Sequence, residues 1–442
     1  MKILIYGLNY APEITGVGKY TSEMAEWFAQ AGHHVKVVTA PPYYPKWRIF
    51  PPYKNRWTQE IIAGIRIYRS PLWVPAQPSA LKRLIHLMSF AVSSFPLMAW
   101  QAFRFRPHIV CLLAPTIFCL PGAWVATRLT RGKLWLHIQD FELDAAQGLG
   151  LLASGGVLTK LTAWMERKLL QGADLITTIS GQMYQRLVHK KVAGPNTWIF
   201  PNWVDTTLIY PLDAPSPLRQ AWGIPEDTFV ALYSGSLGEK QGLEIILEAA
   251  KLLIEQSKIQ FIICGEGFPK QRLMQLAGEE GLDNILFQDL QPLEALNDLL
   301  NIANVHLLPQ RADVADTVLP SKLKGMFASG RPVIATAHPG TQLETYVSNG
   351  GLVIAPENPT LLAQTLEQLF HHPEYCQELG QKARQFALQA WHQQTVLKDL
   401  ETKLIKFSLP NHNLGNSTEL VSAPPSPPSN HRPCVKQGDV NQ

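Results

Sequence analysis

Apolar residues recur along this chain in short runs that alternate with longer segments of helical periodicity. The first run is Lys2–Gly7, and a loop rich in Gly and Pro, a helical segment and a second run at Val35–Thr39 follow it. Strand, helix and strand at this spacing are typical of a parallel sheet with crossover helices. The pattern therefore predicts an α/β fold, with further strands expected at 109–113, 134–138, 175–179 and 197–200.

The alternation stops at 201–228, where Pro, Asp and turn-forming residues indicate a linker between domains. We therefore predict two similar domains in series, 1–204 and 205–390. The segment 360–407 is predicted to be helical with a break near Pro373, and the Pro-, Ser- and Asn-rich residues 409–442 are predicted to be a disordered tail. In the second domain, strands are expected at 229–234, 260–264, 285–287, 305–309 and 332–335.

Two segments of the first domain depart from the alternation. Residues 41–78 are rich in Pro, Tyr and Trp, and a loop of that length is usually functional or flexible. Residues 79–105 are predicted to form one or two apolar helices with basic flanks, interrupted by His86 and Pro96. The apolar stretch barely reaches the length of a bilayer span. We expect mostly a buried helix pair here, and contact of an exposed part with a membrane surface is the alternative.

Composition narrows the class of protein. Of the 442 residues, 46% are hydrophobic and 17% are charged, which is typical of globular domains. The net charge of +4 is too small and diffuse to indicate a nucleic-acid partner. The five cysteines form no C-x-x-C pair, so no metal site is expected, and Cys111, Cys119 and Cys264 are predicted to be buried. The first residues predict a strand rather than a signal peptide, and we expect a cytoplasmic protein.

Three glycine-containing turns follow predicted strands and precede helices. Glycine allows a backbone to approach a ligand, and a helix amino terminus favours an anion. The turn at 235–242 adds a cation, Lys240, so it is a candidate phosphate site, although a lysine at a loop edge is often simply solvated. The first turn, at 12–20, does not have the spacing of a dehydrogenase fingerprint. The candidate binding residues in these turns are Gly16, Val17, Gly18, Gly235, Ser236, Gly265 and Glu266.

Two further segments carry candidate chemistry. Ser321 is predicted to cap a helix that begins with Lys322 and Leu323, whose amides could hold a diphosphate, unless the segment is merely a capped helix. His137 and Asp140 end a predicted strand, on the side of a parallel sheet where ligands bind. A carboxylate there could accept a hydroxyl proton or position an acceptor. Alternatively Asp140, Glu142 and Asp144 cap the next helix.

Taken together and in their order along the chain, these motifs resemble those of glycosyltransferase family 4, the group 1 transferases, over residues 1–405. The resemblance is strongest to the branch of colanic-acid fucosyltransferase-like enzymes. It implies the GT-B architecture, in which two Rossmann-like domains face each other and a helix at 391–408 returns to the first domain. The residues that carry it are Tyr10–Glu13 with Thr15–Gly18, His137–Glu142, Gly235–Gly242, and Leu319–Lys322 with Ala328–Gly330.

The resemblance also implies an activity. A retaining hexosyltransferase would move a sugar from a GDP- or UDP-linked donor to a glycan or a polyprenyl-diphosphate-linked acceptor, in the synthesis of a cell-surface polysaccharide at the inner face of the plasma membrane. No metal and no cofactor would be needed. Lys240 would neutralise the leaving diphosphate, the amides of Gly16 to Gly18 would approach the transferred sugar, and Ser321 to Leu323 would lie along the donor.

The sequence departs from the family pattern at the donor site. Ser236 or Leu237 stands where many members carry Arg, Gly325 stands at the second of two spaced glutamates, and no glutamate stands near 317. Glu344 is the candidate substitute. Two other functions stay open: a nucleotide-sugar epimerase, which would act without an acceptor, and a non-catalytic binding protein, which would show no turnover.

Overall fold

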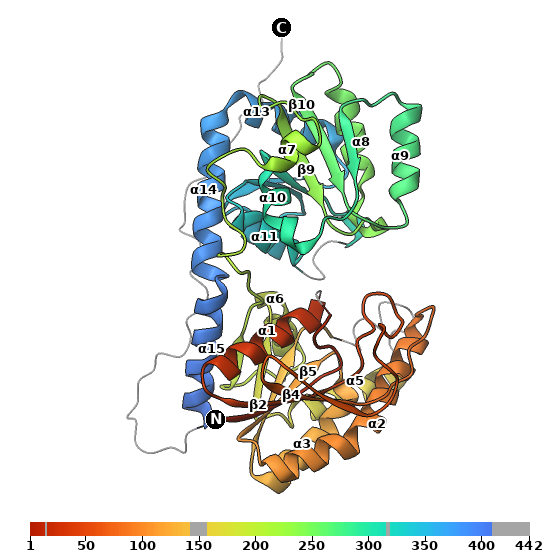
Figure 1. Cartoon of the computed structure of the whole chain (residues 1–442), viewed down its shortest axis with the longest axis vertical. Helices are drawn as coiled ribbons and strands as arrows, with labels where there is room; N and C mark the ends of the chain where they lie inside the picture. Colours follow the sequence, from red (N-terminus) through yellow and green to blue (C-terminus); the bar gives the residue numbers. More distant parts are fainter. Residues whose placement is uncertain (14–15, 142–156, 315–318, 409–442) are drawn as a thin grey trace.

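The structure is a computed structural model that describes residues 1–13, 16–141, 157–314 and 319–408. Two α/β domains follow one another along its long axis, and each is built on one twisted sheet (Figure 1). Among the described residues, the first sheet has eight strands in the order β3-β4-β2-β1-β5-β6-β7-β8 and the second has six in the order β11-β10-β9-β12-β13-β14. Every strand pair is parallel except β3 with β4, which confirms the predicted fold class.

The first sheet is covered by helices on both faces, and its inner strands are therefore continuous apolar runs. In β1, Leu4 and Tyr6 pack towards α2 and α3, whereas Ile3 and Ile5 pack towards α1 and α15. The elements are β1 Lys2–Tyr6, α1 Gly16–Gln30, β2 His34–Thr39, β3 Thr58–Ile62, β4 Ile65–Arg69, α2 Ala80–Phe105, β5 Ile109–Ala114, η1 Ile117–Cys119, α3 Leu120–Thr130, β6 Lys133–Ile138, α5 Val157–Leu170, β7 Leu175–Thr178, α6 Gly181–His189 and β8 Thr197–Ile199.

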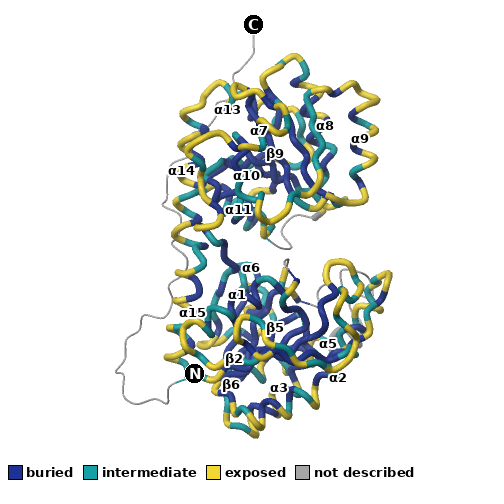
Figure 2. The backbone as a smooth tube through the Cα atoms, viewed as in Figure 1, coloured by how far each residue is buried: buried dark blue, intermediate teal, exposed yellow. Residues whose placement is uncertain are grey.

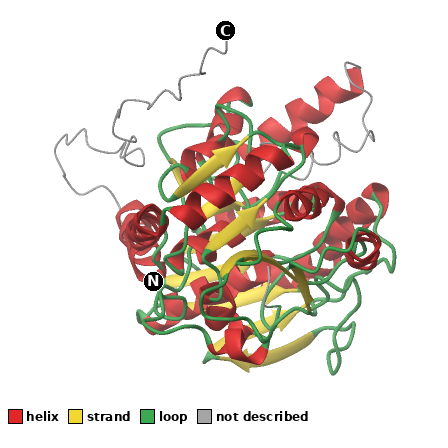
Figure 3. Ribbon diagram, turned by 90° about the horizontal axis from the view of Figure 1, so that it is seen from above, coloured by secondary structure: helices red, strands yellow, loops and turns green. Residues whose placement is uncertain are grey.

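The second domain repeats the same arrangement, and in both domains the buried strands run between exposed helix faces (Figures 2 and 3). Its elements are α7 Pro217–Ala221, β9 Phe229–Ser234, η2 Glu239–Gln241, α8 Glu244–Leu252, β10 Ile259–Cys264, α9 Lys270–Glu279, β11 Ile285–Gln288, η3 Leu293–Ala295, α10 Leu296–Asn301, β12 Val305–Leu308, η4 Ala312–Val314, α11 Lys322–Ala328, β13 Val333–Thr336, α12 Gln342–Val347, β14 Gly351–Ile354, α13 Pro359–His371, α14 Pro373–Ala390 and α15 Gln393–Ser408.

The chain connects the domains at two neighbouring places. The amide of Val204 donates to the carbonyl of Trp391 at 2.8 Å, and the amide of Gln393 donates to the carbonyl of Val204 at 3.1 Å. Trp391 belongs to the core of the second domain, whereas Leu397 and the rest of the apolar side of α15 belong to the core of the first. The terminal helix therefore lies against the first domain (Figure 1), while the boundary at 204 and 205 stays a prediction.

The structure corrects the predicted elements in three places and decides one open alternative. The expected loop 41–78 contains the hairpin β3–β4, and β14 was not predicted. The apolar segment 79–105 is one helix, α2, because Pro96 lies on its exposed side, where water can solvate the carbonyl that the proline leaves unpaired. The predicted helix 360–407 has a second break between Ala390 and Gln393. Cys111, Cys119 and Cys264 are buried as predicted.

Candidate active site

The turns after β9 and β10 form one unit at the carboxyl edge of the second sheet. Gly235 has a φ of +131°, which side-chain-bearing residues rarely adopt. Its amide donates to the carbonyl of Cys264 at 3.0 Å, and the amide of Leu237 donates to that of Glu266 at 2.8 Å. A Cβ added to Gly265 would lie 1.9 Å from the carbonyl oxygen of Gly235. The two turns therefore require glycine for their own packing, whatever ligand they bind.

Two lysines of α11 lie close to this unit without a counter-charge. The Lys322 ammonium is 3.8 Å from the centre of the Tyr233 ring, and its Nζ would lie 3.7 Å from a Cβ added to Gly235. Burial lowers the pKa of Lys322 to about 7. Lys324 is 6% exposed, and burial, followed by the charge of Lys19 in the first domain, lowers its pKa to about 8. Within the described ranges no carboxylate pairs with Lys322 or Lys324, so this edge attracts anions.

The other donor-side candidates fall into two groups. The first group is exposed in the turns after β9 and β10 and consists of Ser236, Lys240 and Glu266. The carbonyl of Lys240 accepts from the amide of Arg311 at 3.2 Å. Ser321 is exposed too, but it has helical backbone angles and its side chain makes no capping bond, so the predicted cap is wrong. Leu323 is fully buried and its amide donates to a local carbonyl, so its side chain belongs to the core.

Glu344 forms hydrogen bonds at the start of α12. Its Oε2 accepts from the amide of Gly340 at 2.6 Å, and its own amide donates to the hydroxyl of the N-cap residue Thr341 at 3.3 Å. The Thr341 hydroxyl thus caps an amide that the first helical turn leaves unpaired, and the Glu344 carboxylate holds the residue before the cap. As a substitute for the missing donor-site glutamates, Glu344 would have to give up its bond to Gly340, so the structure favours a structural role.

At the carboxyl edge of the first sheet, the two catalytic candidates differ sharply. His137 is 1% exposed, its Nδ1 lies 2.8 Å from the hydroxyl of Thr177, and burial lowers its pKa to about 3. In this structure the imidazole is neutral and enclosed by protein groups, and a catalytic role for His137 stays a prediction. Its ring contacts Gln139, whose Oε1 accepts from Asn202 at 3.0 Å. Asp140 is exposed at the end of β6, and Glu142 and Asp144 lie outside the described residues.

The start of α1 belongs to the same edge. Gly16 has a φ of +60° and is exposed, and Val17 is half-buried. Gly18 is buried, and a Cβ there would lie 2.8 Å from the Cβ of Glu13. Glycine at position 18 is thus required by the packing of Glu13, whereas Gly16 and Val17 are the positions open to a ligand.

The two edges face each other across the domains (Figure 1). A Cβ added to Gly181, at the start of α6, would lie 3.8 Å from the Nε2 of Gln342, at the start of α12. Along the described parts of the chain, no group of three or more His, Cys, Asp or Glu side chains could hold a metal ion. Asp140, Phe141 and Glu166 are among the residues that line a small cavity of about 20 Å³.

Comparisons with known proteins assign the family. The family model of 4-like glycosyl transferase domains matches residues 15–203, and that of group 1 glycosyl transferases matches 216–386. The chain is 41% identical to the putative colanic acid biosynthesis glycosyl transferase WcaI of Escherichia coli, over 90% of this chain and 98% of that protein. The chain belongs to the group 1 glycosyltransferases. It is therefore an enzyme that transfers sugars, of the hexosyltransferase type.

Solved structures with the same fold confirm the GT-B architecture of this transferase. Sucrose-phosphate synthase from Thermosynechococcus elongatus superimposes with a TM-score of 0.71 at 19% identity, over 92% of this chain and 98% of that one. Anabaena HepE in complex with UDP-glucose superimposes with a TM-score of 0.64 at 16% identity, over 92% and 100%. WaaG, a glycosyltransferase involved in lipopolysaccharide biosynthesis, superimposes with a TM-score of 0.58 at 16% identity, over 90% and 98%.

Sequence reasoning assigned no role to Glu13, which organises two loops at the carboxyl edge of the first sheet. This carboxylate is 3% exposed and accepts from the amides of Tyr43 and Tyr44 at 2.8 and 2.9 Å and from the Nδ2 of Asn9 at 2.8 Å. Burial raises its pKa, and these three bonds and the charge of Arg69 oppose that rise. Glu13 therefore holds the loop after β1 to the loop after β2. The signal in the sequence that could have indicated this role is an acidic residue within an apolar, glycine-rich loop.

Proposed function

We propose that this transferase moves a sugar, with retention of configuration and without a bound metal, from a GDP- or UDP-linked donor to a glycan or polyprenyl-diphosphate-linked acceptor. The process would be the synthesis of a cell-surface polysaccharide, as the name of the Escherichia coli relative suggests. The observation that carries the proposal is Lys322, a cation without a counter-charge beside the glycine turn of β9. A diphosphate would supply the missing negative charge.

The departing diphosphate sets the electrostatic demand of such a reaction. Preorganised donors that stabilise developing charge usually make the largest contribution to catalysis. In our proposal Lys322 and the amides next to Gly235 hold the diphosphate, and Lys240, which is exposed on η2, closes over it. These cations and dipoles would take the place of a divalent metal.

On the other side, Asp140 would orient the acceptor hydroxyl, and Gly16 and Val17 would lie against the transferred sugar. Asp140 suits this role because it is exposed at the end of β6, at the edge that faces the second domain. His137 would contribute indirectly, because it fixes Gln139 directly before Asp140.

We further propose that the first domain contacts an anionic membrane, on the cytoplasmic side, through the outer side of α2. This helix has buried residues such as Phe90 and Met98 on one side and large exposed apolar side chains on the other. Basic residues stand at both ends of the helix, so apolar and electrostatic attraction would act together. Among the described residues, no helix is long and apolar enough to cross a bilayer. The exposed apolar residues of α2 are Leu81, Ile85, Met88, Val92, Phe95, Trp100 and Phe103.

Co-sedimentation with vesicles tests the membrane contact. The wild-type protein should bind vesicles of phosphatidylglycerol more strongly than vesicles of phosphatidylcholine, and the double variant Val92→Glu, Phe103→Glu should lose this binding. Leu252→Glu is the control, because Leu252 is also a large exposed apolar residue but lies on α8 of the second domain. Equal binding by all three proteins would refute the assignment of the surface to α2.

The transfer itself is tested by a thermal-shift screen against UDP, GDP, dTDP and their sugars, with Mg²⁺ or with EDTA. A nucleotide sugar that binds only the native state raises the melting temperature in proportion to the logarithm of its concentration. We expect one nucleotide family to stabilise the protein equally in both conditions. Stabilisation that requires Mg²⁺ would contradict the metal-free proposal, and stabilisation without turnover in any acceptor screen would favour a binding protein.

A further inference from the structure

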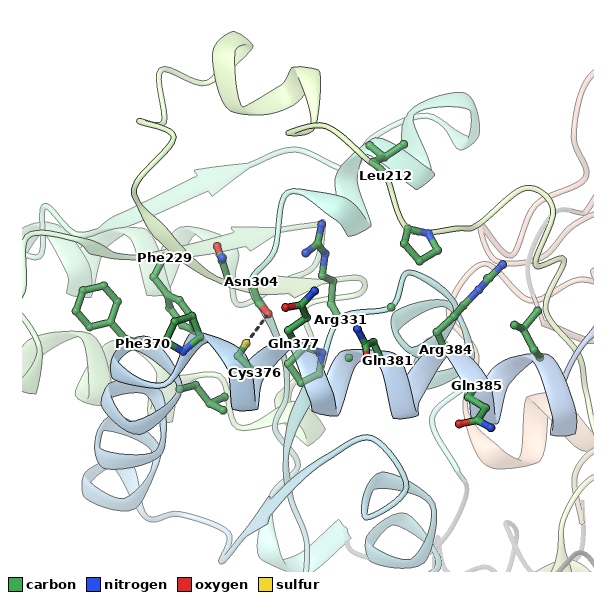
Figure 4. A pocket seen from close by; sticks show the side chains of 17 residues that line it. Leu212, Phe229, Asn304, Arg331, Phe370, Cys376, Gln377, Gln381, Arg384 and Gln385 are labelled. Atoms are coloured by element: carbon green, nitrogen blue, oxygen red, sulfur yellow. Dashed lines mark hydrogen bonds between the residues drawn. The ribbon is translucent and has the colours of Figure 1, made fainter.

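The second domain contains a cavity of about 600 Å³ at the amino edge of its sheet, opposite the edge that carries the candidate active site. One wall is a single side of α14, where Cys376, Gln377, Gly380, Gln381 and Arg384 follow one another at spacings of a helical turn (Figure 4). The other walls are the linker at Pro211 and Leu212, the starts of β9 and β13, and the end of α13. The volume lies in the range of small-molecule sites.

Glycine contacts fix the shape of this cavity. A Cβ on Gly380 would lie 2.3 Å from the carbonyl oxygen of Gly330, and one on Gly330 would lie 2.7 Å from the Cγ of Pro211. The backbone of α14 therefore lies directly against the backbone of the turn before β13, and that turn lies against the side chain of Pro211 in the linker. Because α14 cannot move closer without a steric clash, the cavity beside this contact is preformed.

Arg331 gives the cavity an uncompensated positive charge. Its Nε is buried and has no hydrogen-bond partner within the part of the chain that the structure describes. Two other arginines of this domain do have hydrogen-bond partners. Arg384 donates to three backbone carbonyls, and Arg219 donates to backbone carbonyls and to the Oδ1 of Asn304. Of the residues that the structure describes, no Asp or Glu lines the cavity. A buried donor without a partner costs folding free energy, which an anionic ligand would recover.

We propose that this cavity binds a small organic anion, a phosphate monoester that carries a ring. The guanidinium of Arg331 presents several donors in a plane that suits phosphate oxygens. Phe229, Phe370 and Leu212 provide apolar walls for the ring, and the amide side chains of Asn304, Gln377 and Gln381 provide partners for hydroxyl groups (Figure 4). Sugar phosphates have this combination of groups.

The position of the cavity gives such a ligand a route to the active site. The cavity touches both connections between the domains, the linker and α14. On α14, Arg384 donates to the carbonyls of Thr206 and Ile209 in the linker and to that of Ala328 at the end of α11, the helix that carries Lys322. A bound anion would therefore stabilise one setting of the linker and of α11, and we expect it to alter turnover.

Isothermal titration calorimetry with phenyl phosphate tests the proposal. UDP and GDP are present in excess, so that the donor site is already filled. We expect saturable binding to the wild type and to Lys240→Ala, and no measurable binding of phenol. Arg331→Gln should weaken binding by about tenfold or more, because the charge-assisted hydrogen bonds are lost. Gln381→Glu should weaken it as well, because it adds a negative charge to the lining and leaves the cation in place.

Three outcomes would overturn the proposal: no saturable binding to the wild type, unchanged affinity in both cavity variants, or a loss confined to Lys240→Ala, which would place the ligand at the donor site. The melting temperature of each variant shows whether it is folded. If Arg331→Gln does not fold, Gln381→Glu tests the cavity in its place. Because nucleotide-sugar binding is measured separately, failure here would leave the transferase proposal standing.

Discussion

The pKa of Lys322 leads to a quantitative prediction about donor binding. Burial against Tyr233 lowers the pKa of this lysine to about 7 in the free protein. A diphosphate next to the ammonium would raise that pKa, since an opposite charge favours the charged form. Binding must therefore take up a proton above pH 7, and the affinity must fall as the pH rises through 7.

The size of the effect follows from the fraction of Lys322 that is protonated. With a pKa of about 7, roughly nine tenths of the lysine is charged at pH 6 and roughly one tenth at pH 8. The dissociation constant of a nucleotide sugar should therefore rise about tenfold over this interval, which is ~1.4 kcal/mol. A nucleotide sugar is a suitable ligand because its diphosphate is esterified at both ends and has no proton to lose near pH 7.

Calorimetry at pH 6, 7 and 8, in two buffers with different ionisation enthalpies, measures both the affinity and the proton uptake. The matched control is Lys322→Arg, because a guanidinium stays charged throughout this range. Its dissociation constant should change by no more than about twofold, the share that Lys324 contributes because its pKa is about 8. An affinity of the wild type that is independent of pH, or an equal slope in Lys322→Arg, would refute the assignment of Lys322 to the diphosphate.

Four substitutions test the rest of the site. Lys240→Ala should lower turnover by tenfold or more without changing the melting temperature, because the side chain is exposed, and an unchanged rate would remove it from the mechanism. Asp140→Asn should lower transfer while nucleotide affinity by calorimetry stays constant; weaker nucleotide binding would contradict its place on the acceptor side. Gly265→Ala should lower the stability measured in urea by about 3 kcal/mol or more, since its Cβ meets the carbonyl of Gly235, and a stability within 1 kcal/mol of wild type would refute the packing. Glu13→Gln should cost about 2 to 4 kcal/mol in the same assay, because a donor replaces the acceptor that faces Asn9, and an unperturbed stability would show that Glu13 is not essential to the loop.

Sequence patterns predicted the strands well where both faces of a strand are buried. The run Phe229–Ser234 is strand β9 over its full length, because six consecutive apolar or small residues leave few alternatives. The hairpin β3–β4 was missed because β3 pairs with a neighbour only on one side, and it lies among prolines and aromatic residues that are typical of loops. The four-residue strand β14 is too short to show a period.

The site was predictable at the level of motifs and much less at the level of side chains. The sequence indicated that His137 and Asp140 end the same strand, but the direction of each side chain depends on neighbours such as Thr177, which is 40 residues away. The contact of Glu13 with Tyr43 spans 30 residues between two loops. Ser321 stands at a typical cap position, yet its backbone already has helical angles. Such outcomes depend on tertiary packing, which a local pattern does not encode.

The chain passes between the domains twice, near Val204 and near Trp391, and this has a consequence for protein engineering. A fragment that ends at residue 204 lacks α15, and would leave exposed the surface on which Leu397, Leu400 and Leu404 are buried. Such a fragment should aggregate unless residues 392–408 are supplied as a peptide or fused through a short loop. For the same reason, an exchange of donor domains between relatives should replace residues 205–390 as an internal insert, with both ends of the recipient domain retained.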